Sequence, residues 1–193
     1  VVTDACGRAV TIPDTVKPVI RVGVGSLRFT TYMDALDLLV GVEENELGVG
    51  AQKPFAYLHQ DVWEKLPQTD NNGETYDEQI ISANPDVIIA QMDKATADAY
   101  QQKTGIPVVT IPMVEGILDD AVFDMINLLG EVYGKQDRAK ELTDYLTAMK
   151  QDIADRVAKV DKDKAPSVYV SGVSFKGAHG FEGTEAGYAP LAA

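Results

Sequence analysis

The sequence predicts an α/β fold: a mostly parallel sheet sandwiched by helices, then one long connecting helix, and an incomplete second α/β lobe. Val87–Ala90 is a continuous apolar run, which is typical of a parallel strand covered on both faces. Helical spacing precedes it over residues 76–83. Asn84-Pro85-Asp86 lies between them as a turn, because the residue before a proline is pushed out of the helical region. Residues 136–160 contain no glycine or proline, and their apolar residues recur at steps of three and four, which indicates a long helix.

Apolar runs and turn residues predict the elements that come before this strand. They are a hairpin of residues 1–4 and 8–12, a strand at 19–24, a helix from Ser26 through Met33 to Leu36, and a strand at 39–42. Ser26 would cap that helix at its start. Residues 45–72 have weak periodicity, so we expect a long loop with one short helix near residues 60–65. Long ordered loops are often functional.

The α/β pattern continues after the strand. The expected elements are a helix near residues 95–103, a strand at 107–111, a helix at 118–133 that ends before Gly134, the long helix, and a strand at 167–170. Glycine is a common residue just past a helix end. We therefore divide the chain into an N-terminal lobe at residues 1–135, a connecting helix and linker at 136–164, and the start of a truncated C-terminal lobe at 165–193.

Composition argues against several classes of function. The formal net charge of −13 argues against nucleic-acid binding, because a protein that binds phosphate backbones needs a positive surface. No stretch approaches the ~20 apolar residues of a membrane span. Cys6 is the single cysteine, so no internal disulfide is expected, and its place in the hairpin indicates a structural role. Two histidines without a Ser/His/Asp or Cys/His pattern predict neither a catalytic site nor a metal site.

The segment around the Pro-Asp turn resembles a family signature. The residues that match it are Tyr76, Glu78, Ile80, Pro85, Asp86, Val87, Ile88 and Ile89. The opening phrases at residues 2–4 and 7–13 match too, as does the step from residues 34–36 to residues 39–42. Together these phrases are similar to the solute-binding proteins that serve ABC importers of iron–siderophore complexes, haem and cobalamin. The resemblance covers about the first two thirds of the chain.

This resemblance implies a function and its partners. It implies the capture of an iron–siderophore or related iron chelate outside the cytoplasm, with cobalamin or haem as the alternative ligand, and delivery to the permease of an ABC importer. No reaction and no covalently bound cofactor are implied. The membrane would be reached only through the permease, or through a lipid anchor lost with a signal segment. Members of this class join two lobes by one long rigid helix, which suits residues 136–160.

The candidate ligand site consists of the loops that follow the strands, because ligands of open α/β sheets bind beyond the carboxyl ends of strands. We expect residues 25–29, 91–93 and 112–114 to converge on one face. Arg28 could hold an anionic group with its planar fork, or it could be a solvated residue of the first helical turn. The candidate ligand-binding residues are Ser26, Leu27, Arg28, Phe29, Tyr57, Gln91, Met92, Met113 and His179.

Other interpretations of individual residues stay open. Phe29 could belong to the core, and His179 could be an exposed loop histidine. Trp63 is expected in a buried aromatic cluster. By the resemblance, Glu78 matches a surface glutamate that docks into an arginine pocket of the permease; otherwise it is an ordinary exposed glutamate of a helix.

Two rival classes of function also stay open. One is an α/β enzyme with an acidic active site that uses Asp93 or Glu43 as an acid or base. No cofactor motif or catalytic pair supports this enzyme, and residues 43–45 are expected to form a solvated acidic turn. The other is an interaction module that pairs with another chain through the long helix.

Overall fold

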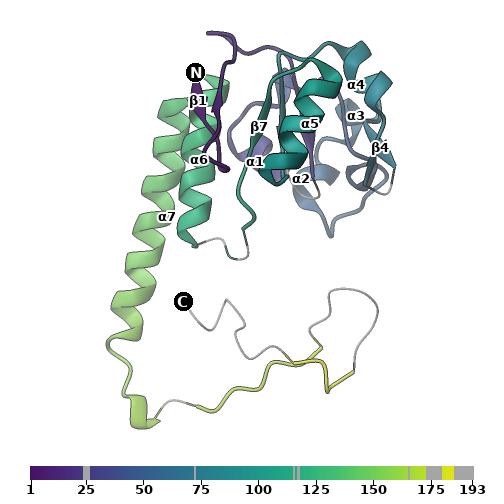
Figure 1. Cartoon of the computed structure of the whole chain (residues 1–193). Coiled ribbons are helices and arrows are strands. Elements are labelled where there is room, and N and C mark those ends of the chain that lie inside the picture. Colours follow the sequence, from purple (N-terminus) through teal and green to yellow (C-terminus); the bar gives the residue numbers. More distant parts are fainter. Residues whose placement is uncertain are drawn as a thin grey trace. The chain divides into compact units, whose positions relative to one another are not determined.

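The computed structural model describes residues 1–23, 27–71, 73–114, 116, 118–164, 166–172 and 180–184. The chain divides into two compact units, Val1–Thr143 and Asp144–Ala193, which are described one at a time. The first unit holds the sheet and the helices that pack on it (Figure 1).

Three parallel strands of the described chain form the centre of the first unit. β3 (Val19–Val22), β6 (Val87–Ala90) and β7 (Val108–Thr110) lie side by side in the order β3-β6-β7. Ile88 of β6 pairs with Ile20 on one side and with Val108 on the other. The strands are almost wholly buried, as expected when both faces of a sheet are covered. The predicted α/β class with a mostly parallel sheet is therefore confirmed.

Helices cover both faces of this sheet. On one face α4 (Asp77–Ala83) and α5 (Lys94–Thr104) pack on the strands (Figure 1). The buried cluster that joins them consists of Ile20, Ile80, Ile88, Ala90, Ala97, Tyr100 and Val108. On the other face, Arg21 of β3 donates a hydrogen bond to Tyr133 at the end of α6 (Asp120–Tyr133). Successive side chains of a strand point to opposite faces, so Ile20 and Arg21 identify the two covered faces.

The predicted N-terminal hairpin is present and is tied to β7. β1 (Val2–Thr3) and β2 (Ala9–Val10) pair antiparallel. The backbone N–H of Ala5 donates to the carbonyl oxygen of Thr110 at 3.1 Å. Arg8 donates to the carbonyl oxygen of Val108 at 3.0 Å and forms a buried ion pair with Asp4 at 3.1 Å. These contacts hold the hairpin against both ends of β7.

Two predicted elements near the start of the chain are wrong in their extent. α1 (Leu27–Tyr32) ends at Tyr32 rather than Leu36, because Asp34 has a φ of 53°, and a 3-10 turn η1 (Leu36–Leu38) follows. Residues 39–42 are extended beside β3 but form only single parallel bridges, Leu39 to Val19 and Val42 to Gln68. No glycine or proline marks the early end of α1, whereas Gly41 lies inside the second segment.

The predicted long loop is more ordered than expected. Its elements are η2 (Glu44–Glu46), α2 (Pro54–Tyr57), α3 (Gln60–Trp63) and a hairpin of β4 (Asp70–Asn71) with β5 (Glu74–Thr75). α3 is the short helix expected near residues 60–65, whereas the others were not predicted. Each is too short to show a period in the sequence.

The predicted long helix is confirmed as α7 (Gln136–Val157), and η3 (Lys162–Lys164) follows it. The predicted strand at residues 167–170 is wrong, because these residues carry no strand and the described pairing of the second unit is one antiparallel bridge between Ser171 and Thr184. In this unit the hydroxyl of Tyr169 donates to the carbonyl oxygen of Phe181 at 2.8 Å. Among the helices described, none is both long enough and apolar enough to span a bilayer.

Candidate functional site

The parallel direction of β3, β6 and β7 brings their carboxyl ends to one edge of the sheet. Gln91 follows β6, and its backbone N–H donates to the carbonyl oxygen of Val22 at 3.1 Å. Ile111 follows β7, and its N–H donates to the carbonyl oxygen of Ala90 at 2.9 Å. We call Gly23, Gln91, Met92 and Ile111 the carboxyl edge.

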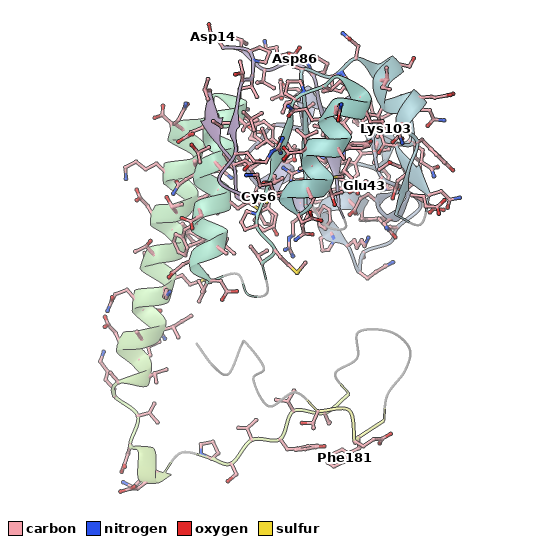
Figure 2. All side chains as sticks on the ribbon, in the orientation of Figure 1. Cys6, Asp14, Glu43, Asp86, Lys103 and Phe181 are labelled. Carbon is pink, nitrogen blue, oxygen red and sulfur yellow. The ribbon has the colours of Figure 1, made fainter. Side chains whose placement is uncertain are left out.

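Other segments reach the same end of the first unit. Cys6 of the hairpin turn donates through its Sγ to the carbonyl oxygen of Met92 at 3.5 Å. In Figure 2, Cys6 and Glu43 lie toward one end of the first unit, and Asp86, which precedes β6, lies at the other. The carboxyl edge is therefore framed by residues from the hairpin and from the segment after residue 42.

Gly23 determines how closely β3 and β6 approach each other at this edge. It has a φ of +123°, a backbone conformation that residues other than glycine rarely adopt. A Cβ atom placed on it would lie 3.0 Å from the Cβ of Gln91. Only glycine fits this close approach without displacing Gln91.

Glu43 accepts a short hydrogen bond at the carboxyl edge and is not the solvated residue that the sequence predicted. Its Oε1 accepts from the backbone N–H of Gly23 at 2.6 Å, and the residue is only 3% exposed. Burial raises the pKa of Glu43 to about 7, because an ionised carboxylate loses its hydration. The Gly23 N–H lowers the pKa, Asp70 and then Glu46 raise it further, and Arg21 lowers it.

Arg28 lies in the first turn of α1, five residues after Gly23 in the sequence. Its side chain is half-buried, with Cζ 4.9 Å from the centre of the Phe29 ring, a cation–π distance. Its Nε is shielded from solvent and has no hydrogen-bond partner in the described structure. α1 also packs against α2, the helix that carries Tyr57.

The remaining predicted ligand residues fall into three groups. Leu27 and Phe29 are buried in the core, so their side chains offer little surface to a ligand. Gln91 and Met92 are half-buried at the carboxyl edge, and Met92 packs against the core cluster. Tyr57 and Met113 are exposed. Ser26 and His179 lie outside the described residues.

Three further predicted residues can be placed. Trp63 is buried beside the rings of Phe55 and His59, so its prediction as a member of an aromatic cluster is confirmed. Glu78 is exposed in the first turn of α4. Asp93 caps α5, with Oδ1 accepting from the N–H of Thr96 at 3.0 Å, and the hydrogen bonds from Thr96 lower its pKa.

Two features of the site were not found from the sequence. Gly23 falls inside the strand expected at residues 19–24, and its contacts with Glu43 and Gln91 depend on residues distant in sequence. Arg21 is buried in β3, where an arginine inside an apolar strand was the available signal. Within the described residues, no group of three or more acidic, histidine or cysteine side chains is arranged to hold a metal ion.

A parallel sheet covered by helices on both faces, with loops that meet at its carboxyl edge, is typical of α/β ligand-binding lobes. The sequence profile described as periplasmic binding protein matches residues 29–180, which is more than half of the chain. This chain belongs to the periplasmic binding protein family.

Individual relatives agree with this membership. The chain is 25% identical over 173 residues to the uncharacterized ABC transporter substrate-binding lipoprotein YvrC of Bacillus subtilis strain 168, with 88% of this chain and 51% of the relative covered. It is also 25% identical over 193 residues to the molybdate-binding protein MolA of Haemophilus influenzae, with 89% and 53% covered. The chain thus spans about half the length of the relatives that it matches.

Solved structures show the same fold. MolA bound to molybdate matches with a TM-score of 0.69 at 24% identity, over 84% of this chain and 55% of that chain. The siderophore binding protein BauB, bound to a complex between two molecules of acinetobactin and ferric iron, matches with a TM-score of 0.61 at 17% identity. That match covers 78% of this chain and 51% of BauB. At the level of the family, the predicted extracytoplasmic location and the prediction of a non-enzyme are confirmed.

Proposed function

We propose that this chain is part of the solute-binding subunit of an ABC importer, and that it captures an anionic, oxygen-rich metal species for delivery to the permease. Within this proposal, residues 1–135 form one lobe, residues 136–164 form the connecting helix and its linker, and residues 165–193 begin a second lobe. The membership of the family supports the importer role. The carboxyl edge of the first unit supplies the ligand-facing surface.

The observation that carries the proposal is the buried, unpartnered Nε of Arg28. A donor on a charged group that is shielded from water costs free energy until an acceptor meets it. The guanidinium offers a planar fork that matches the paired oxygens of carboxylates, catecholates and oxyanions. Phe29 lies against the same guanidinium and limits how it can turn.

An iron–siderophore complex is the first candidate ligand, because its anionic oxygens suit Arg28 and because BauB, a protein of the same fold, binds one. Molybdate is the second candidate, because the relative MolA binds it and because it is an oxyanion. The two share one chemistry, an anion whose oxygen atoms surround a metal. Haem and cobalamin belong in the same test because the sequence resemblance implies them.

Isothermal titration calorimetry of the natural full-length protein tests this proposal. The ligands are an anionic ferric catecholate, a neutral ferric hydroxamate, molybdate, haem and cobalamin. We expect one of the two anionic metal–oxygen ligands to bind most tightly. Arg28→Ala should weaken that binding by about 10- to 100-fold, since a hydrogen bond to a charged group contributes about 1.5–3 kcal/mol.

Lys17→Ala is the matched control. It also removes one positive charge, but Lys17 is an exposed residue that precedes β3, at the end opposite to Gly23. Its substitution should leave affinity unchanged, because long-range charge effects are screened over about 10 Å at ordinary salt. If neither anionic ligand binds the wild type, or if both variants bind equally well, the proposal fails.

A further inference from the structure

Glu43 is buried, and its carboxylate contacts the backbone of Gly23 at the carboxyl edge. Its Oε1 accepts a hydrogen bond of 2.6 Å from the backbone N–H of Gly23, which precedes Arg28 by five residues. Glu43 directly follows residues 39–42, the extended segment beside β3. An anion bound at the carboxyl edge would therefore lie near this buried carboxylate.

The groups around Glu43 are mostly acidic. Glu46 of η2 and Asp70 of β4 act on it as like charges, and Arg21 of β3 acts on it as an opposite charge. Glu46 and Asp70 are themselves buried, and Lys53 lies 3.5 Å from Glu46. The two neighbouring acidic groups therefore disfavour a further negative charge at this place, and Arg21 offsets them only in part.

We propose that Glu43 is a positioning residue that couples the capture of an anionic ligand at the carboxyl edge to the uptake of a proton. This inference rests on the proposed function. The inference deepens the proposed function by adding a proton to the binding equilibrium and by naming Glu43 as the residue that takes up this proton. Arg28 attracts the anion, and protonation of Glu43 removes the charge that opposes it.

The hydrogen bond to Gly23 survives this protonation. A neutral carboxyl group keeps a carbonyl oxygen that can accept from the Gly23 N–H. The backbone anchor is therefore retained while the charge disappears. Glu43 can change its ionisation without releasing the residue that it holds.

Burial supports the proposal, because it raises the pKa of Glu43 to about 7. The group is then partly protonated near neutral pH in the free protein. A bound anion stabilises the protonated form further, so the pKa rises again in the complex. Protons are taken up on binding at and above neutral pH, and affinity falls as the pH rises.

Calorimetry of the natural full-length protein measures this coupling. Molybdate and an anionic ferric catecholate are titrated between about pH 6 and about pH 9, in two buffers with different enthalpies of ionisation. The buffer dependence of the binding enthalpy gives the number of protons taken up. For the wild type we expect uptake that approaches one proton, and an affinity that falls by up to about tenfold per pH unit.

Glu43→Gln separates charge from position. Its amide oxygen can still accept from Gly23, but it carries no titrating proton. We expect this variant to bind without proton uptake, with an affinity at about pH 8 that is higher than that of the wild type by up to about tenfold. Glu44→Gln, at the exposed neighbouring position, is the control and should keep the proton uptake of the wild type.

The outcomes distinguish this inference from the proposed function. Binding of either anion to the wild type without proton uptake overturns the inference and leaves the function standing, even if the glutamine variant does not fold. Equal uptake in wild type and Glu43→Gln overturns it as well. Absence of binding by both anions at every pH overturns the proposed function and this inference together.

Discussion

The Nη1 of Arg21 donates a hydrogen bond of 3.2 Å to the hydroxyl oxygen of Tyr133. Both side chains are buried, and the Oγ1 of Thr30 lies 2.9 Å from the same hydroxyl oxygen. Tyr133 thus joins the sheet and the end of α6 to α1. Because α1 carries Arg28, this contact links the core of the first unit to the residue on which the proposed function depends.

Tyr133→Phe should destabilise the protein by about 1.5–3 kcal/mol, because a hydrogen bond to a buried charged group is lost. Urea unfolding of the variant and the wild type measures this difference. Tyr32→Phe is the control, since Tyr32 is 38% exposed and its substitution should change stability by no more than about 0.5 kcal/mol. Equal losses in the two variants would show that the Arg21–Tyr133 contact contributes little.

Glu43 should make stability depend on pH. Its pKa in the folded protein is about 7 against an ordinary value of 4.5, so the folded state binds the proton more tightly than the unfolded state. The contribution of Glu43 is therefore fully present below about pH 4.5 and is lost as the pH rises to about 7. From the shift, the loss is of the order of 3 kcal/mol.

The measurement is the difference in unfolding free energy between wild type and Glu43→Gln at about pH 5 and about pH 8. At the higher pH, the unfolding free energy of the variant should rise relative to that of the wild type. A constant difference across this range would mean that Glu43 titrates alike in the folded and unfolded states.

Gly23→Ala should both destabilise the protein and weaken ligand binding. The new residue would be strained at a φ of +123°, at a cost of about 1–3 kcal/mol, and its Cβ would press on Gln91. Gly48→Ala is the control, because Gly48 also has a positive φ, +63°, but a Cβ there meets nothing within 4 Å. Urea unfolding and calorimetry of both variants should show the larger losses for Gly23→Ala. Similar losses in the two variants would mean that the positive φ, and not the contact of the new Cβ with Gln91, causes the effect.

The parts of the fold that the sequence predicted are those with local causes. β6 was predicted with its observed bounds, because four consecutive apolar residues follow a Pro-Asp turn. α7 was predicted because a long amphipathic period is hard to mistake. α1 was predicted too long, because Asp34 leaves the helix without any glycine or proline to mark the end.

The site could be predicted only in part, since its key contacts join distant residues. The rule that ligands lie beyond the carboxyl ends of strands indicated the loop of Gln91 and Met92. These residues lie at that edge, and their contact with a ligand stays a prediction. Glu43 was expected in solvent because its neighbours are acidic and polar. Its surroundings include Gly23 and Asp70 of the β4–β5 hairpin, and no local pattern in the sequence predicts that these distant residues meet Glu43.

Glu78 provides the last prediction, which concerns transport rather than binding. It is exposed in the first turn of α4, and the sequence resemblance leads us to expect that it docks to the permease. Glu78→Ala should lower the rate of ligand uptake by cells severalfold and make uptake less sensitive to salt, because an exposed interface charge acts mainly on association. Ligand affinity in calorimetry should stay unchanged. Glu74→Ala removes an equally exposed glutamate from β5 and should leave uptake normal. If Glu78→Ala instead weakened ligand binding while uptake per bound ligand stayed normal, Glu78 would belong to the ligand site and not to a docking surface.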